Sequence, residues 1–263
     1  MKKKGIDLLF WFSVFFIALI IISAIFAPYI APYNPYAINP HAILQPPSAE
    51  HLFGTDRIGR DVFSRMVYAS RISIEVSLIA VGISTVIGVF IGAISGYFSG
   101  WVDSLLMRFT DIMLTFPVFF LILTVVVVIG PSIFNVMVVI GLTGWMGVAR
   151  IVRAEVLKIK EMNYIHAAKL LGKSDFYVIL KHVIPNALSP VVVYATLGIG
   201  SAILTESGLS FLGLGVQPPT ASWGSILSEG KDVIDIAWWI SFFPGAVIFL
   251  TVVSFTIIGE KLK

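Results

Sequence analysis

Long stretches without a charged residue constrain this chain more than any other feature of its sequence. Five of them, separated by charged segments, cover residues 8–28, 76–102, 112–149, 183–205 and 236–259. A helix needs about 20 mostly apolar residues to cross the ~30 Å hydrocarbon layer of a bilayer. Gly130-Pro131 divides the third and longest stretch into two halves of suitable length. The sequence therefore predicts six membrane-spanning helices, of which the third and fourth form a tight hairpin.

Composition supports a membrane protein and excludes several kinds of site. Of the 263 residues, 57% are hydrophobic and only 13% are charged, whereas about a quarter of the residues are charged in soluble domains. The sequence has no cysteine, which excludes disulfides, thiolate metal sites and thiol nucleophiles. Its four histidines show no spacing suited to a metal, and its net charge of +3 gives no indication of nucleic-acid binding. We expect no catalytic residue, cofactor or metal on this chain.

The positions of lysine and arginine predict the orientation, because segments that stay inside the cell carry an excess of both. With residue 1 inside, thirteen of these residues fall in inner segments and five in outer ones. The inner ones are Lys2, Lys3, Lys4, Arg108, Arg150, Arg153, Lys158, Lys160, Lys169, Lys173, Lys181, Lys261 and Lys263, and the outer ones are Arg57, Arg60, Arg65, Arg71 and Lys231. Since the number of spans is even, we expect both termini in the cytoplasm. The first apolar stretch is longer than that of a signal peptide, so we interpret it as an uncleaved span.

Residues 150–182, an inner segment, are too long for a simple turn and predict a helix, a turn and a second helix. Apolar residues recur at helical spacing from Glu155 to Leu171. Gly172 can adopt the left-handed conformation that ends a helix, and Ser174 can cap a second helix that begins at Asp175. Pro185 falls at the start of the fifth span, where a missing amide donor costs little.

Small side chains in this inner segment allow another backbone to approach closely. Ala167 and Ala168 lie among apolar residues that include Tyr164 and Leu171. Two interpretations are open at this point: a helix that docks into a groove of a partner protein, or a surface helix that packs on its own bundle.

Two runs of the inner segment, His166–Gly172 and His182–Asn186, resemble the EAA loop of bacterial and archaeal ABC-importer permeases. In that family, Glu-Ala-Ala precedes a glycine and, at a fixed spacing, an apolar-X-apolar-Pro end, and the loop forms the coupling helix that enters a cleft of the ATPase subunit. The resemblance implies that coupling residues of this chain are Tyr164, His166, Ala167, Ala168, Leu171, Gly172 and Pro185. His166 replaces the glutamate of the motif, which leaves open how that end of the helix is tethered.

Residues 51–65, 206–224 and 238–245 are similar to segments of the C-type permease subunit of dipeptide, oligopeptide and nickel importers. A histidine before the proline, here His182, is common in that branch. The resemblance implies an all-α, six-span, type-I ABC importer permease of the plasma (inner) membrane. Residues 1–71 would form the first span and a proline-rich outer segment, and residues 72–260 the permease core, with the coupling loop at about 150–185.

By the same resemblance, the chain is a transporter subunit and not an enzyme, in an ATP-driven importer of di- or oligopeptides. The implied partners are a second homologous permease subunit, two ATPase subunits that hold ATP and magnesium, and an extracytoplasmic binding protein that delivers the substrate. An importer of nickel or another small solute is an alternative. An ion-coupled secondary transporter is a further one, although it would need carboxylates or broken helices at mid-membrane.

Charged residues of the outer segments are further candidates for function. Arg57 and Asp61, and likewise Asp61 and Arg65, are four residues apart, so we expect them to pair along one face of a solvated helix at the outer interface. Alternatively, this segment docks the binding protein or covers the pathway. Glu75 and Glu206, near the outer ends of spans two and five, either line the pathway or only cap a helix or reach interfacial water.

Four glycines of the second span, Gly82, Gly88, Gly92 and Gly96, recur at a spacing of four to six residues. This pattern predicts close contact with a neighbouring helix, since small residues let two membrane helices approach.

Overall fold

The computed structural model describes the backbone of residues 2–262 and the side chains of residues 8–262. Within that range the chain is helical, apart from loops and a single bridge between Thr55 and Asp61. The α-helices are α1 (Lys2–Ile25), α2 (Ala27–Ile30), α3 (Val62–Phe98), α4 (Gly100–Thr115), α5 (Val118–Ile129), α6 (Ile133–Ile159), α7 (Asn163–Leu170), α8 (Asp175–Val178), α9 (Ile184–Phe211), α10 (Trp223–Gly230) and α11 (Trp239–Lys261). The side chains of Lys2, Lys3 and Lys4, and the whole of Lys263, lie outside the described residues.

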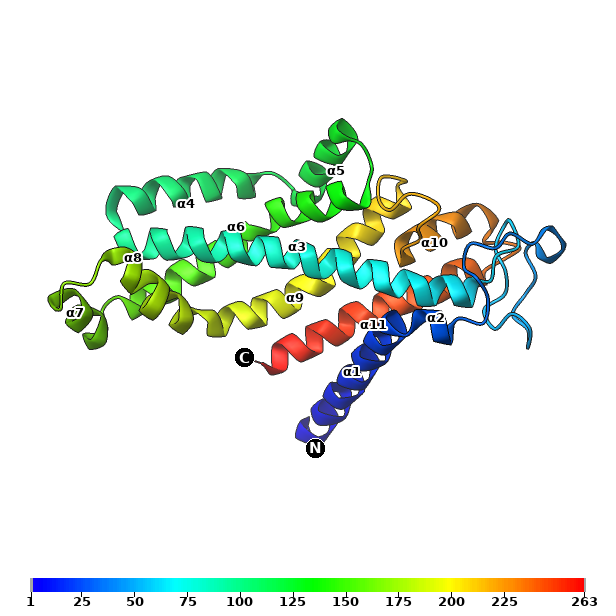
Figure 1. Ribbon diagram of the computed structural model, residues 1–263, viewed down its shortest axis with the longest axis horizontal. Helices are drawn as coiled ribbons and strands as arrows, with labels where there is room; N and C mark the ends of the chain where they lie inside the picture. Colours follow the sequence, from blue (N-terminus) through cyan, green and yellow to red (C-terminus); the bar gives the residue numbers. More distant parts are fainter. Residues whose placement is uncertain (1, 263) are drawn as a thin grey trace.

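Six helical passes make up the molecule. Five helical stretches are long and apolar enough to cross a bilayer, and the bent pair α4–α5 makes a sixth when counted as one span. Figure 1 shows that successive passes alternate in direction, with both ends of the chain on the side of the bundle that faces α7. The all-helical prediction is confirmed within the described residues, and the six-span prediction holds when the bent pair is counted as one span.

The third pass differs from the single helix expected from residue 112 onward. α4 ends at Thr115, and α5 leaves at an angle of 83° after Phe116 and Pro117. Proline lacks an amide donor and forces the preceding residue into an extended conformation, which Phe116 adopts with φ −84° and ψ 133°. The turn expected at Gly130-Pro131 is confirmed, since α5 ends at Ile129 and Gly130 has φ +93°.

The second pass begins earlier than expected. α3 starts at Val62 instead of residue 76, and the Asp61 side chain caps it by accepting the amide of Ser64. Its 37 residues span ~55 Å at 1.5 Å per residue, far more than the hydrocarbon layer. Arg65, Arg71 and Glu75 are therefore helical residues, and a division of the chain after residue 71 falls inside α3.

The centre of the bundle is the seam between α3 and α6, where glycines permit contact of the two backbones. A Cβ atom at Gly88, Gly92 or Gly96 would lie 2.5–2.9 Å from atoms of α6. The predicted close contact is confirmed for these three. It is wrong for Gly82, where a Cβ would meet nothing within 4 Å.

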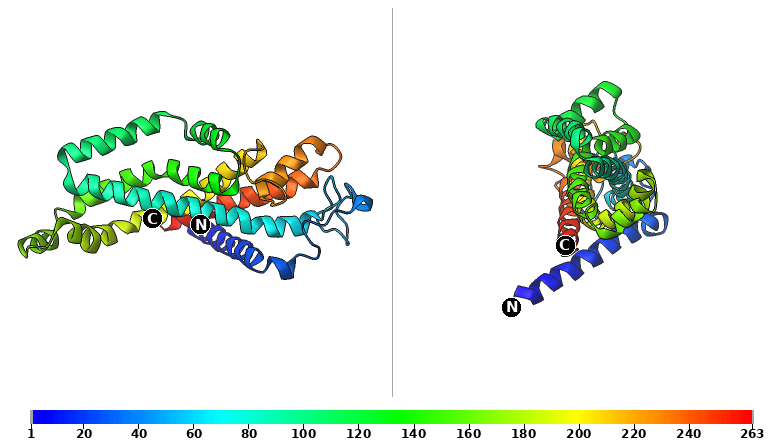
Figure 2. Two further views of the ribbon diagram at one scale, coloured as in Figure 1. Left: turned by 45° about the horizontal axis from the view of Figure 1, so that its top comes forward. Right: turned by 90° about the vertical axis from the view of Figure 1, so that its left-hand side faces the viewer.

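α1 lies at the edge of the bundle against α11 and α3 and diverges from it toward the N-terminus (Figure 2). Its last turn is held by Arg71 of α3, whose guanidinium donates to the carbonyls of Ala24 and Ile25 at 3.0 and 3.1 Å. The positive side chain thereby satisfies carbonyls at the negative end of the α1 dipole.

Candidate functional site

α7 projects beyond the long helices at one end of the molecule, and α8 lies beside the end of α3 (Figure 1). Ile165 and Ala168 anchor α7, since both are buried in a cluster with Val178 and Ile179. The same region exposes several large apolar side chains to solvent, interspersed with polar and charged residues. Its exposed large side chains, which we call the α7–α8 surface, are Met162, Tyr164, Leu170, Leu171, Phe176 and Tyr177. Exposed large apolar side chains gathered in one short segment are suited to contact with a partner.

The turns of this region are partly as predicted. Gly172 has φ +74° and ends α7, and the Ser174 hydroxyl accepts the amide of Tyr177 and caps α8. The expected single helix from Glu155 to Leu171 is wrong. α6 ends at Ile159 in a tight turn, and Met162 is extended before α7 starts.

The structure brings six of the seven expected coupling residues together on α7 and the turn that follows it. Tyr164, His166, Ala167, Leu171 and Gly172 are exposed, whereas Ala168 is buried. Pro185 lies apart from them, exposed in the first turn of α9.

A polar link between α7, α8 and α3 was not apparent from the sequence. The Tyr97 hydroxyl, one residue before the end of α3, donates to the Asp175 carboxylate at 2.6 Å. The Lys169 ammonium of α7 lies 4.7 Å from the centre of the Tyr97 ring and 3.8 Å from Asp175. The His182 ring packs against the rings of Tyr164 and Tyr177, with distances of 6.3 and 5.8 Å between ring centres. These contacts connect α7 and α8 to the end of α3.

The opposite end of the molecule carries a buried ionic cluster. Asp56, fully buried, accepts from the guanidinium groups of Arg60 and Arg65 at 2.6 Å. Both arginines also donate to Glu229 of α10, at 2.5–2.9 Å. The cluster ties the loop before α3 to α10, a segment more than 160 residues away.

The pairs expected along one helix face in this segment are wrong. Asp61 bonds to His51 at 2.9 Å and to Ser64, while Arg57 pairs with Asp232 at 3.1 Å. The physical reason is that Asp56–Arg60 form a turn ahead of the helix. The expected solvated helix is also wrong, since Asp61 and Arg65 are buried.

The two glutamates have different environments. Glu75 is exposed on α3 and has no polar partner within the described part of the chain. Glu206 is fully buried, so the expectation that it reaches interfacial water is wrong. One of its oxygens accepts from Ser210 at 2.6 Å and from Ser222, the N-cap of α10, at 2.7 Å.

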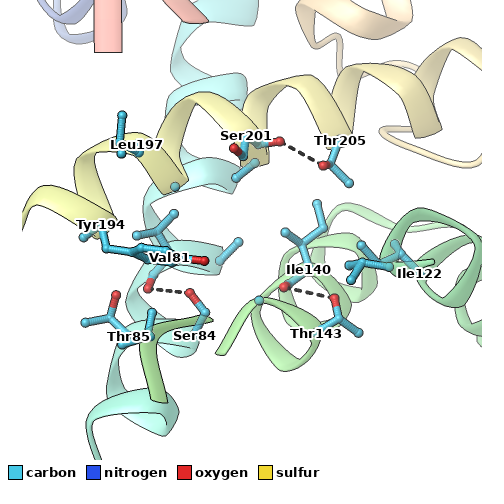
Figure 3. A pocket seen from close by; sticks show the side chains of 17 residues that line it. Val81, Ser84, Thr85, Ile122, Ile140, Thr143, Tyr194, Leu197, Ser201 and Thr205 are labelled. Atoms are coloured by element: carbon cyan, nitrogen blue, oxygen red, sulfur yellow. Dashed lines mark hydrogen bonds between the residues drawn. The ribbon is translucent and has the colours of Figure 1, made fainter. Parts of the chain in front are cut away.

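A cavity of about 290 Å³ lies between α3, α5, α6 and α9 (Figure 3). Six of its lining residues carry a hydroxyl group: Ser84, Thr85, Thr143, Tyr194, Ser201 and Thr205. No acidic or basic side chain is among the described residues that line it. Neither Glu75 nor Glu206 belongs to this lining. Sequence reasoning missed the cavity because isolated serines and threonines are common within apolar helices, where they bond to their own backbone.

Comparison with known proteins gives two family matches. Residues 88–262 match the binding-protein-dependent transport system inner membrane component, and residues 8–47 match the N-terminal transmembrane domain of oligopeptide transport permease C.

Named relatives cover almost the whole chain. The dipeptide transport system permease protein of Alkalihalophilus pseudofirmus is 42% identical over 92% of this chain and 80% of its own length. A probable D,D-dipeptide transport system permease protein of Escherichia coli is 40% identical over 95% of this chain and 84% of its own length. A glutathione transport system permease protein of the same species is 39% identical over 94% of this chain and 82% of its own length. These relatives are permease subunits of ABC transporters and not enzymes. This chain therefore belongs to the family of binding-protein-dependent transport system inner membrane components, as a multi-pass permease of the inner membrane.

Proposed function

We propose that this chain is one of two permease subunits of an ATP-driven importer of di- or oligopeptides. The α7–α8 surface carries the proposal, because an apolar surface that projects beyond the bundle fits a cleft of an ATPase subunit. The names of the dipeptide and glutathione relatives support the substrate class. The neutral cavity supports a peptide over nickel, since none of its lining residues is a carboxylate or imidazole suited to that metal.

In this proposal both termini and α7 lie in the cytoplasm, as the lysine and arginine positions predict. Two ATPase subunits bind ATP and magnesium, and an extracytoplasmic binding protein delivers the peptide at the end that carries the ionic cluster. We assign Arg57, at the exposed rim of that end, to docking of the binding protein, while Asp61 and Arg65 hold the segment in place. Glu75, exposed and unpaired on α3, faces the second permease subunit or the pathway rather than lipid.

Alternating access follows from the links between α7 and the core. Closure of the ATPases on ATP draws the two docked α7 helices together. Lys169, Tyr97 and Asp175 transmit this movement to α3, which packs on α6 and α9. Since these three helices line the cavity, their movement opens it outward, and hydrolysis restores the inward-open state.

The proposal is tested by placing a charge on the α7–α8 surface. Leu171 is 78% exposed, so Leu171→Asp leaves the fold intact but desolvates a carboxylate on docking. Burial of a leucine contributes about 1.5–3 kcal/mol, so we expect at least a tenfold loss of ATPase subunits that co-purify with the tagged chain, and a matching loss of ATP-dependent uptake.

Leu52→Asp is the matched control, since Leu52 is 54% exposed at the opposite end. It leaves recovery of the ATPase unchanged. Equal recovery of ATPase subunits with Leu171→Asp and with the wild type would show that the α7–α8 surface does not bind the ATPase.

A further inference from the structure

Another cavity, of about 290 Å³, lies between α1 and α11. It opens where α1 diverges from the bundle toward the N-terminus (Figure 2), whereas farther along the two helices close on a buried cluster that includes Ile20 and Ile248. Its lining residues are Leu9 and Phe10 of α1 and Ile257, Glu260 and Lys261 of α11. The cavity is therefore the open end of a wedge between two membrane spans.

This cavity lies at the boundary between hydrocarbon and water. The apolar span of α1 begins at Leu8, one residue before the cavity, and α11 carries no charged residue before Glu260. The inner wall of the cavity is thus apolar, while its mouth carries a carboxylate and an ammonium group. Because the headgroups of a bilayer adjoin the hydrocarbon core at this depth, a matching ligand has one polar and one apolar part.

Positive charge predominates around the mouth of the cavity. The Lys261 ammonium lies 5.9 Å from the centre of the Phe10 ring, so it stays over the cavity wall. Residues 2–10 and 257–262, the helix ends that flank the cavity, contain four lysines and two acidic residues, a net charge of +2. Three of these lysines belong to the first turn of α1. Clusters of lysine beside a membrane span, and basic pockets between spans, attract anionic phospholipids.

We propose that the cavity between α1 and α11 binds one anionic phospholipid with a glycerol headgroup, from the leaflet on the side of the chain termini. Lys261 pairs with its phosphate, Glu260 accepts hydrogen bonds from the hydroxyls of its headgroup, and its acyl chains lie against Leu9 and Ile257. A further protein helix, about 10 Å across, would bring no phosphate to the lysines. The inference rests on the membrane location of the family and is independent of the transported substrate.

A lipid in this wedge also stabilises the position of α1. It contacts both helices in the region where α1 leaves the bundle, and so fills the space that the divergence of the two helices opens. Since a ligand that binds only the folded state raises its stability, we expect the unfolding temperature to rise when this lipid is added.

The test measures the lipids retained by the full chain, purified in detergent with its partner subunits, by native mass spectrometry. The probes are dioleoyl phosphatidylglycerol, phosphatidylethanolamine and phosphatidylcholine. We expect the wild type to retain at least five times more phosphatidylglycerol than either of the other two, because these have no net charge. Added phosphatidylglycerol raises the unfolding temperature, and added phosphatidylcholine does not.

Two variants separate the cavity from general attraction to lysine. Lys261→Gln removes the cation at the mouth, and Ile257→Trp fills the cavity without changing any charge, so each lowers retention of phosphatidylglycerol at least fivefold. Lys158→Gln is the matched control, because Lys158 is exposed on α6, pairs with Glu155 at 2.9 Å and lies outside the cavity lining. It retains phosphatidylglycerol as the wild type does.

Equal retention of the three lipids by the wild type overturns the proposed site. Wild-type retention of phosphatidylglycerol by Lys261→Gln or by Ile257→Trp overturns it as well. A loss with Lys158→Gln as large as the loss with Lys261→Gln reduces the effect to surface charge and has the same consequence. None of these results bears on the proposed function, because none of them measures transport.

Discussion

At the scale of single residues, Glu206 shows how a carboxyl group is accommodated inside a membrane protein. It is fully buried in α9 and accepts two serine hydroxyls, one of them from the N-cap of α10. Its second oxygen, Oε2, is buried without a hydrogen-bond partner among the described residues. The residue therefore joins α9 to α10, which is a structural role that its position near the end of an apolar stretch did not reveal.

Replacement of Glu206 separates hydrogen bonding from charge. Glu206→Gln keeps an oxygen that accepts from Ser210 and Ser222, so we expect little loss of stability. Glu206→Leu removes the acceptor of both hydroxyls, which then have only each other at 3.4 Å, and costs about 1–3 kcal/mol. Thermal unfolding of the detergent-solubilised chain measures the difference. Equal unfolding temperatures for the two variants would mean that the hydrogen bonds contribute nothing.

At the scale of helices, the seam between α3 and α6 depends on glycine. Gly92→Leu places a side chain where even a Cβ would lie 2.5 Å from the Ala149 carbonyl oxygen. Overpacking of this kind costs 1–3 kcal/mol or more, so we expect little monodisperse protein. Gly82→Leu, on the same helix but in open space, retains the wild-type yield. Comparable size-exclusion profiles for both variants would contradict the close packing of this seam.

Helix number and type could be predicted from the sequence, whereas several helix limits could not. Apolar length fixes where a span must lie, so the six passes and the turn at Gly130 were expected. Apolar length does not predict that a span bends by 83° at Pro117. It also does not predict that the charged residues Arg65 and Arg71 continue a helix beyond the apolar stretch. The early start of α3 depends on partners far away in the chain, namely Glu229 for Arg65 and the α1 carbonyls for Arg71.

The candidate site was predictable to a similar extent. The capped turn from Gly172 to Ser174 is local, and its geometry agrees with the expectation. The link from Tyr97 to Asp175 and the cavity around Thr85 are contacts between helices, and no spacing within one helix encodes them.

At the scale of the whole molecule, the ionic cluster joins the segment before α3 to α10. Arg65 is buried and pairs with both Asp56 and Glu229. Arg65→Met leaves the buried Asp56 with Arg60 as its only charged partner, and loss of one member of a buried ion pair costs about 3–5 kcal/mol.

Arg57→Met is the matched control, because Arg57 and Asp232 are more than half exposed and such a pair contributes at most about 1 kcal/mol. The unfolding temperatures of Arg65→Met and Arg57→Met distinguish the two contributions. If Arg57→Met lowers the unfolding temperature as much as Arg65→Met, the cluster does not hold this end together.

Contact between α7 and an ATPase is the central claim, and the sequence offers a direct way to measure it. Since the chain has no cysteine, Leu171→Cys introduces a unique thiol on the α7–α8 surface, and Leu52→Cys introduces one at the opposite end. Native membranes that contain either variant are treated with a bifunctional reagent that joins a thiol to nearby amines, and the products are identified by mass spectrometry. The account predicts that Leu171→Cys yields an adduct with a protein that contains a phosphate-binding loop, and that Leu52→Cys does not. Adducts of Leu171→Cys with this chain alone, in membranes that still import peptide, would contradict it.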